Sequence, residues 1–226
     1  HRRTPRYGPR PLRWCLHHPG AVEETDRSRG VSVVDRSPWG LDPSWTFLNH
    51  GSFGAAPLPI LTEQRRWQDE LEHQPVQFML NTAIPAIEEA RQALASFVGS
   101  HPEHLALVSN ATEGVNTVLR SLPWTTKDHI VITNHSYGAC TRTAEYVAGR
   151  YNTELTIITL DLPLTSEDGV VEAVIDGLPP STTFLMIDHI TSTPGLILPV
   201  ERIVPVLEDR GIRVLVDGAH APGQLD

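Results

Sequence analysis

Lysine is almost absent from this sequence of 226 residues, since Lys127 is the only one. Any chemistry that needs a lysine amine therefore depends on that single side chain. Cysteine is nearly as rare, because Cys15 and Cys140 are the only two and their spacing matches no metal-binding pattern. So few cysteines are typical of a protein from a reducing compartment, so they predict a cytoplasmic location and give no positive indication of a metal.

Long apolar runs and a basic folded body are also lacking. No apolar stretch approaches the roughly 20 residues that a membrane-spanning helix needs. The net charge is −9, yet residues 1–36 hold eight of the eighteen basic residues and only four of the 27 acidic ones. The remaining residues carry ten basic and 23 acidic side chains, a balance that argues against a nucleic-acid-binding surface or a membrane partner.

The first 38 residues differ in character from the rest. They are rich in arginine and lack the apolar segment of a secretory signal peptide. We predict that segment 1–38 is a disordered tail or a misassigned start, with a transit peptide as the alternative. Residues 39–100 are predicted to form an N-terminal arm with helices, and residues 101–226 a separate α/β domain.

Hydrophobic periodicity predicts the secondary structure from about Trp45 onward. Two amphipathic helices are expected over 60–73 and 83–98, the second with Gly99 as its C-cap. Short apolar strands then alternate with helices. We expect strands at 105–109, 130–133, 154–160, 183–187 and 213–216, and helices at 112–122, 138–150, 170–178 and 199–210. This alternation predicts an α/β fold with a mainly parallel sheet flanked by helices on both faces.

Two loops after the first predicted strands carry residues that suit an anion and an aromatic ring. Residues 110–114 lead into a helix, so their backbone N–H groups suit a phosphate, although this loop taken alone favours plain capping of the helix by Thr112. His135 and Tyr137 follow the next strand, and either ring suits a face of an aromatic cofactor. A surface loop is the alternative for this second stretch.

Two further loops bring carboxylates and imidazoles to strand ends. Asp188 and His189 follow one predicted strand, and Asp217 and His220 follow the last. A metal site built from these four is the alternative, but their spacing matches no zinc or iron pattern. Because open α/β sheets bind cofactors at the carboxyl ends of their strands, four such loops predict a cofactor site. A carboxylate at this edge suits the ring nitrogen of a pyridine cofactor.

Four stretches together resemble the class V aminotransferase family of pyridoxal-phosphate enzymes, which have fold type I. The stretches are residues 47–57, 110–116, 188–200 and 216–223, and they run in the order of the family. They are most similar to the isopenicillin N epimerase-like branch. The resemblance implies the large domain of that fold, pyridoxal 5'-phosphate as the cofactor and a small amino-acid substrate.

The resemblance also implies roles for the first two loops. Ala111, Thr112 and Glu113 would bind the cofactor phosphate through backbone N–H groups and the threonine hydroxyl. His135 or Tyr137 would stack on the pyridine ring.

The remaining roles implied by the resemblance concern the ring atoms and the substrate. Asp217 would pair with the pyridinium nitrogen, and His220 would donate to the phenolic oxygen of the cofactor, with Thr191 or Ser192 as helpers. The substrate would be approached by Asn49, His50 and Ser52.

One residue that the family requires is missing. Its Schiff-base lysine follows the aspartate strand by a few tens of residues, and the sequence ends at Asp226 before that point. Lys127 is expected at the opposite edge of the sheet, in a polar connection that enters a strand. We therefore expect an N-terminal fragment that lacks the C-terminal small domain, has no catalytic residue of its own and is inactive as written.

The resemblance implies an enzyme that acts at the Cα of an amino acid, as an epimerase, aminotransferase, lyase or desulfurase. A degenerate homologue that acts as a binding or scaffold protein is the alternative. A dinucleotide-binding oxidoreductase is not favoured, because the glycine fingerprint of that class is missing. By analogy with the family we expect a homodimer in the full-length form, with the helices at 60–73 and 83–98 against the partner.

Overall fold

The computed structural model describes residues 36–225, and the predictions for residues 1–35, Cys15 among them, lie outside this range. The described residues form two compact units: a helical unit of residues 36–107 and a sheet unit of residues 108–225. Among the described residues, no helix combines the length and the apolar character that a bilayer span requires.

The helical unit contains two long helices. Its elements are α1 (His50–Phe53), α2 (Leu58–His73), α3 (Pro75–Gln77), the π-helix η1 (Phe78–Thr82), α4 (Ala83–Phe97) and the short 3-10 helix η2 (Pro102–His104). The helices α2 and α4 confirm the predictions over 60–73 and 83–98. Gly99, with a φ of 68°, takes the left-handed conformation predicted for the end of α4.

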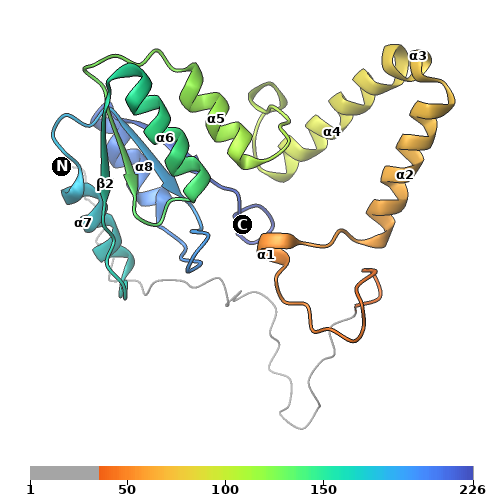
Figure 1. Ribbon diagram of the computed structural model, residues 1–226, viewed down its shortest axis with the longest axis horizontal. Helices are drawn as coiled ribbons and strands as arrows, with labels where there is room; N and C mark the ends of the chain where they lie inside the picture. The colour runs from red at the N-terminus through yellow and green to blue at the C-terminus, as the bar shows by residue number, and fades with distance from the viewer. Residues whose placement is uncertain (1–35, 226) are drawn as a thin grey trace, which may run out of the picture. The chain divides into compact units, whose positions relative to one another are not determined.

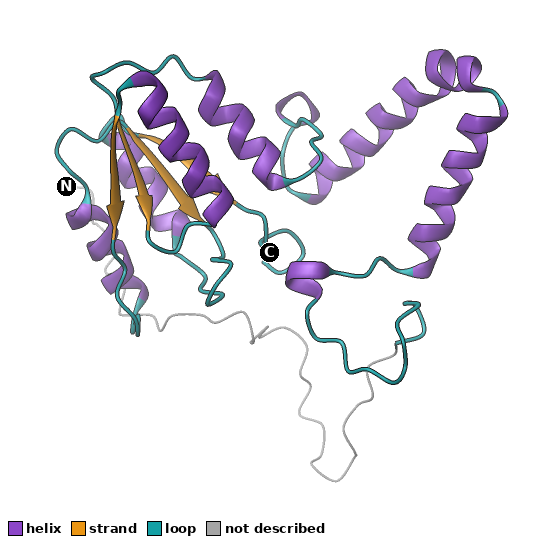
Figure 2. Cartoon of the chain, viewed as in Figure 1, coloured by secondary structure: helices purple, strands orange, loops and turns teal. Residues whose placement is uncertain are grey.

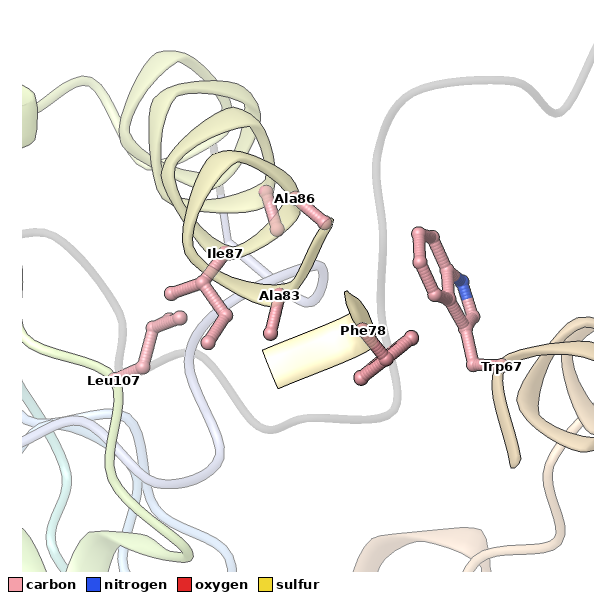
Figure 3. Close-up of a pocket in the computed structure, with 7 residues that line it drawn as sticks. Trp67, Phe78, Ala83, Ala86, Ile87 and Leu107 are labelled. Atoms are coloured by element: carbon pink, nitrogen blue, oxygen red, sulfur yellow. The ribbon is translucent and has the colours of Figure 1, made fainter. Parts of the chain in front are cut away.

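An apolar pocket of about 340 Å³ lies within the helical unit. Figure 3 shows Trp67 of α2 and Phe78 of η1 on one side of it, and Ile87 of α4 and Leu107 on the other. The remaining lining residues are alanines of α4. Because no charged side chain lines this pocket, it offers nothing to a phosphate or a carboxylate, and the predicted cofactor residues lie elsewhere.

The sheet unit is built from alternating helices and strands. In chain order they are α5 (Ala111–Ser121), β1 (His129–Thr133), α6 (Gly138–Tyr151), β2 (Glu154–Ile158), α7 (Glu167–Gly177), β3 (Phe184–Asp188), α8 (Val200–Asp209) and β4 (Arg213–Asp217). The strand order is β2-β1-β3-β4 and every pairing is parallel (Figure 2). The predicted α/β fold with a parallel sheet is confirmed.

Helices cover both faces of this sheet. Successive strand residues point to opposite faces, so each strand contributes to two cores. Val131, Leu185 and Ile187 pack in one core with residues of α7 and α8. Ile130 and Met186 pack in the other with residues of α5 and α6. In Figure 1, α6 accordingly lies in front of the sheet and α8 behind it.

One prediction of secondary structure was wrong. Residues 105–109 form no strand, because none of the described strands pairs with them, and Leu107 and Val108 remain about half exposed. Apolar character alone does not make a strand without a hydrogen-bonded neighbour. The helix predicted over 138–150 is confirmed as α6, and Asn152 at its end takes the left-handed conformation with a φ of 52°.

Candidate cofactor site

The site lies where the strand order reverses in the sheet unit. The chain leaves β1 through α6 on one face, and it leaves β3 through α8 on the other. The carboxyl ends of β1 and β3 therefore lie beside a switch point, the position at which open α/β sheets bind their ligands. Polar side chains from β1, β3, β4 and the start of α6 gather at this edge.

Asp217 is one of these side chains, and it makes contacts through both carboxylate oxygens. It ends β4 and is only 6% exposed. Its Oδ1 accepts the backbone N–H of Ala219 at 3.1 Å, and its Oδ2 accepts the thiol of Cys140 at 3.4 Å. In the register of the sheet, Asp217 lies opposite Asp188, which ends β3 and is 4% exposed. The site thus contains two buried carboxyl groups on adjacent strands.

A proton is held on Asp188 up to neutral pH. Burial raises the pKa of its carboxyl from 3.8 to about 7, and the charge of Asp217 adds to the rise. Hydrogen bonds from the Ser136 hydroxyl and the Tyr137 backbone act in the opposite direction. Two adjacent carboxylates do not both ionise easily in a buried site, so the pair favours a single negative charge below about pH 7.

Cys140 is a buried thiol in the first turn of α6. Burial and the charge of Asp217 raise its pKa to about 12, and the hydrogen bond to Asp217 and the nearby Asp188 contribute further. The side chain is 1% exposed and belongs to the core beneath α5 and α6. It therefore stays a neutral thiol that packs in this core, which does not suit a nucleophile.

The loop before α5 is a capped helix start. Asn110, not Thr112, is the N-cap: its Oδ1 accepts the backbone N–H of Glu113 at 2.8 Å. The Glu113 carboxylate in turn accepts the N–H of Ser109 at 2.8 Å. The first N–H groups of a helix have no partner within it, so those of Ala111 and Thr112 are the donors that suit a phosphate. Since α5 contacts β4, this helix start belongs to the same unit as Asp217.

The two aromatic candidates differ in their surroundings. The Nε2 of His135 lies 2.9 Å from the carbonyl oxygen of Leu160, which follows β2. Tyr137 immediately precedes α6, is 47% exposed, and its backbone hydrogen-bonds to Asp188. The sheet order puts β2 on the far side of β1 from β3 and β4, so the ring of His135 is tied to the side away from Asp217.

The remaining predicted residues of the sheet unit lie in loops after β3 and β4. Thr191 is buried and its hydroxyl oxygen accepts the N–H of Leu196 at 2.9 Å, which closes the loop. Ser192 is exposed, and His220 is partly buried in the turn after β4. Within residues 36–225, no three His, Cys, Asp or Glu side chains group together as metal ligands would.

The predicted substrate residues belong to the helical unit. Asn49 precedes α1, and His50 and Ser52 lie within it, all of them exposed. The ring of His50 packs edge-on against Phe47, with ring centroids 4.7 Å apart. The geometry of the sheet unit therefore does not test their predicted contact with the substrate.

Lys127 lies at the other end of the sheet from Asp217. It is exposed in the turn that enters β1, and its backbone N–H donates to the Thr125 hydroxyl. All strands are parallel, so this turn lies at their amino ends and Asp217 lies at a carboxyl end. Because a strand rises about 3.3 Å per residue, the length of β1 separates Lys127 from the carboxyl ends. The sequence-based expectation that Lys127 lies at the opposite edge is confirmed.

Replacing Lys127 by alanine is accordingly expected to leave cofactor affinity unchanged. Pyridoxamine 5'-phosphate, which carries an amine and forms no Schiff base with a lysine, is the suitable probe. Equilibrium dialysis of wild type and Lys127→Ala gives the two dissociation constants. A loss of more than about threefold, roughly 0.7 kcal/mol, would place Lys127 at the site and contradict this geometry.

The contact between Cys140 and Asp217 has no signature in the sequence. The two residues are 77 positions apart and come from α6 and β4. No spacing rule connects a helix start with the end of a strand that is not its neighbour in sequence. Ser136 was missed for the same reason, since its hydrogen bond to Asp188 joins the loop after β1 to β3.

The chain matches known proteins along most of its length. The sequence profile of the family Aminotransferase class-V matches residues 67–225. Isopenicillin N epimerase of Streptomyces clavuligerus is 34% identical over 207 residues, which cover 91% of this chain and 50% of that protein. A probable chloroplastic L-cysteine desulfhydrase of Arabidopsis thaliana is 28% identical over 200 residues, covering 82% of this chain and 42% of that one.

A solved structure shares both the fold and some sequence. The structure of a C-DES mutant with glycine covalently linked to its pyridoxal-phosphate cofactor aligns with a TM-score of 0.77 and 25% identity. The alignment covers 84% of this chain and 51% of that one. The chain thus spans about half the length of the curated relatives it matches. With its parallel sheet, its buried strand-end aspartate and this profile match, the chain belongs to the class V aminotransferase family of pyridoxal-phosphate enzymes.

Proposed function

We propose that residues 108–225 hold pyridoxal 5'-phosphate in an enzyme that acts at the Cα of an amino acid. The observation that carries the proposal is Asp217, a buried carboxylate at the end of β4 with one donor on each oxygen. These two donors orient the carboxylate, and a buried carboxylate needs a cationic partner for its charge. The N–H of a pyridinium ring has that charge and that hydrogen-bonding capacity.

The donor set of the sheet unit supports binding of the phosphate and the ring of the cofactor. The start of α5 offers the N–H groups of Ala111 and Thr112, and the Thr112 hydroxyl, to a phosphate, and the dipole of the helix favours an anion there. Asp217 holds the ring nitrogen in its protonated form. When bound, pyridoxal phosphate supplies an electron sink for the electrons at the substrate Cα. Thr191 or Ser192, which follow β3, and His220, which follows β4, are proposed as donors to the phenolic oxygen.

Of the two aromatic candidates, we favour Tyr137 as the side chain that stacks on the ring. Its backbone hydrogen-bonds to Asp188, and it immediately precedes α6, the helix whose Cys140 contacts Asp217. His135 is held at Leu160 instead. Asn49, His50 and Ser52 remain proposals for the substrate side of the site.

The relatives support a proposal for the class of reaction. They are named as an isopenicillin N epimerase, L-cysteine desulfhydrases and a hercynylcysteine sulfoxide lyase. We propose an epimerase or a C–S lyase acting on an amino acid, which are the reaction classes in the names of these relatives. Cys140 itself is too deeply buried to act as a nucleophile. Lys127 cannot reach Asp217, so residues 36–225 bind the cofactor without supplying the amine that anchors it.

A homodimer in the cytoplasm completes the proposal. The support for a dimer is the apolar surface of α4, where Ile84 and Phe97 are 69% and 67% exposed. Sedimentation of the purified protein tests this, and a single monomeric species at micromolar concentration would contradict it. The low cysteine content is the support for a reducing compartment.

The cofactor proposal is tested directly by binding. Pyridoxamine 5'-phosphate is titrated into the protein, and binding is followed by equilibrium dialysis with inorganic phosphate as the competitor. Saturable binding at one site, weakened by phosphate, is the expected result. Absence of binding at millimolar cofactor would rule out the proposed site.

Replacing Thr112 by alanine is expected to weaken this binding. Loss of one hydrogen bond to a charged phosphate costs about 1.5–3 kcal/mol, which corresponds to roughly tenfold or more in affinity. Thr117→Ala is the matched control, since Thr117 is an exposed threonine of the same helix. Equal effects of the two substitutions would show that helix stability, and not phosphate binding, is responsible.

A further inference from the structure

The thiol of Cys140 approaches the side chain on which the proposed function depends. Its Sγ lies 3.4 Å from Oδ2 of Asp217, within the distance that sulfur hydrogen bonds reach. The bond joins the first turn of α6 to the end of β4, across 77 positions of the chain. Apart from the Ala219 N–H, it is the only hydrogen-bond donor to the Asp217 carboxylate among residues 36–225.

The two donors act on different oxygens of the same carboxylate. The Ala219 N–H holds Oδ1 from the turn after β4, and the thiol holds Oδ2 from α6. A carboxylate accepts about four hydrogen bonds in its plane, so both oxygens keep room for a further donor. Contacts on both oxygens fix the rotation of the carboxylate about its last side-chain bond, which a single contact would leave free.

The chemistry of a thiol suits this position. The side chain is neutral and 1% exposed, so it adds no charge to a region that already holds Asp188 and Asp217. A lysine or arginine at position 140 would neutralise Asp217 and leave it no attraction for a cation. A thiol donates weakly, so the carboxylate keeps its charge for the ring nitrogen.

We propose that Cys140 is a positioning residue, which holds Asp217 in the orientation that receives the ring nitrogen of the cofactor. The inference rests on the proposed function, because it takes Asp217 as the partner of that nitrogen. A pyridine ring bound at Asp217 would exclude water from the carboxylate. The thiol then remains as the hydrogen-bond donor to Oδ2. Its removal therefore destabilises the cofactor-bound protein more than the cofactor-free protein.

The test is a double-mutant cycle on the affinity for pyridoxamine 5'-phosphate, measured in the full chain by equilibrium dialysis. Cys140→Ala removes the donor and is expected to weaken binding about threefold to tenfold, the range for one weak bond to a charged group. In the Asp217→Asn background the same substitution is expected to change the affinity less than about twofold, because the thiol acts through the charge of Asp217.

Two further variants separate positioning from packing. Cys140→Ser keeps a donor and is expected to restore affinity to within about twofold of wild type. Thr143→Val removes a buried hydroxyl of the same helix that donates only to the Ala139 carbonyl, and no change is expected. Thermal unfolding of each variant identifies any that fail to fold.

The outcomes distinguish this inference from the function on which it rests. If wild type does not bind the cofactor, or Asp217→Asn binds as well as wild type, the proposed function fails. If Asp217→Asn weakens binding but Cys140→Ala does not, Cys140 has no positioning role. Equal losses from Cys140→Ala in both backgrounds would show a purely structural role and also overturn the inference.

Discussion

Replacing Asp217 by asparagine is expected to weaken pyridoxamine 5'-phosphate binding by about tenfold to a hundredfold. Asparagine keeps the size of the side chain but removes the negative charge, so the hydrogen bond to a pyridinium ring becomes one between neutral groups. Hydrogen bonds to charged groups contribute about 1.5–3 kcal/mol, and each 1.4 kcal/mol is about a factor of ten. Equilibrium dialysis gives the affinities, and the nitrogen resonance of ¹⁵N-labelled cofactor reports whether the ring is protonated.

Two substitutions of the same kind serve as controls for Asp217→Asn. Asp209→Asn changes an exposed carboxylate at the end of α8 and is expected to have no effect. Asp188→Asn, measured at pH 6, is expected to have an effect below about threefold, because Asp188 already holds a proton at that pH. If Asp188→Asn proved the more harmful of the two buried substitutions, the roles of the two aspartates would have to be exchanged.

The second large effect concerns stability, and it depends on pH. Burial and the neighbouring Asp217 raise the pKa of Asp188 from 3.8 to about 7 in the folded protein. Between these values the folded protein binds a proton that the unfolded chain has lost. The contribution of Asp188 to the unfolding free energy is therefore fully present below about pH 4 and lost as pH rises through about 7.

Asp188→Asn removes this pH dependence, because the amide stays neutral at every pH. Near pH 4 the variant is expected to match wild type, and at pH 8 to be the more stable. The gain is at most about 4 kcal/mol, since one pKa unit corresponds to about 1.4 kcal/mol. Urea unfolding between pH 4 and 8, with amide hydrogen exchange of β3 and β4 as the probe of the sheet unit, gives the two profiles.

The control for the pH profile is Asp176→Asn, an exposed carboxylate of α7, which is expected to follow wild type. A wild-type sheet unit whose stability rises between pH 4 and 7, by a margin that Asp188→Asn abolishes, would mean that Asp188 is ionised and paired in the folded state. That result would contradict the single negative charge assigned to Asp188 and Asp217. It would also contradict the small effect of Asp188→Asn expected for cofactor binding at pH 6.

The sequence by itself determined the class of fold and the edge of the sheet at which the candidate residues lie. Alternating apolar strands and amphipathic helices are local patterns, so β1, β2, β3 and β4 and their helices were predicted within a few residues. Parallel strands bring their carboxyl ends to one edge whatever their order. For this reason Asp188 and Asp217 were placed at the same edge without knowledge of the sheet, and the motif resemblance supplied the cofactor.

Only the tertiary structure decided which of these residues meet and in which state. The prediction of a strand at 105–109 was wrong because a strand depends on a hydrogen-bonded neighbouring strand. Local apolar character does not reveal whether such a neighbour is present. The order β2-β1-β3-β4 puts Asp188 beside Asp217, and the packing of α6 brings Cys140 to the same carboxylate. Protonation of Asp188 follows from that burial and proximity, which are properties of contacts between distant positions and have no signature in the sequence.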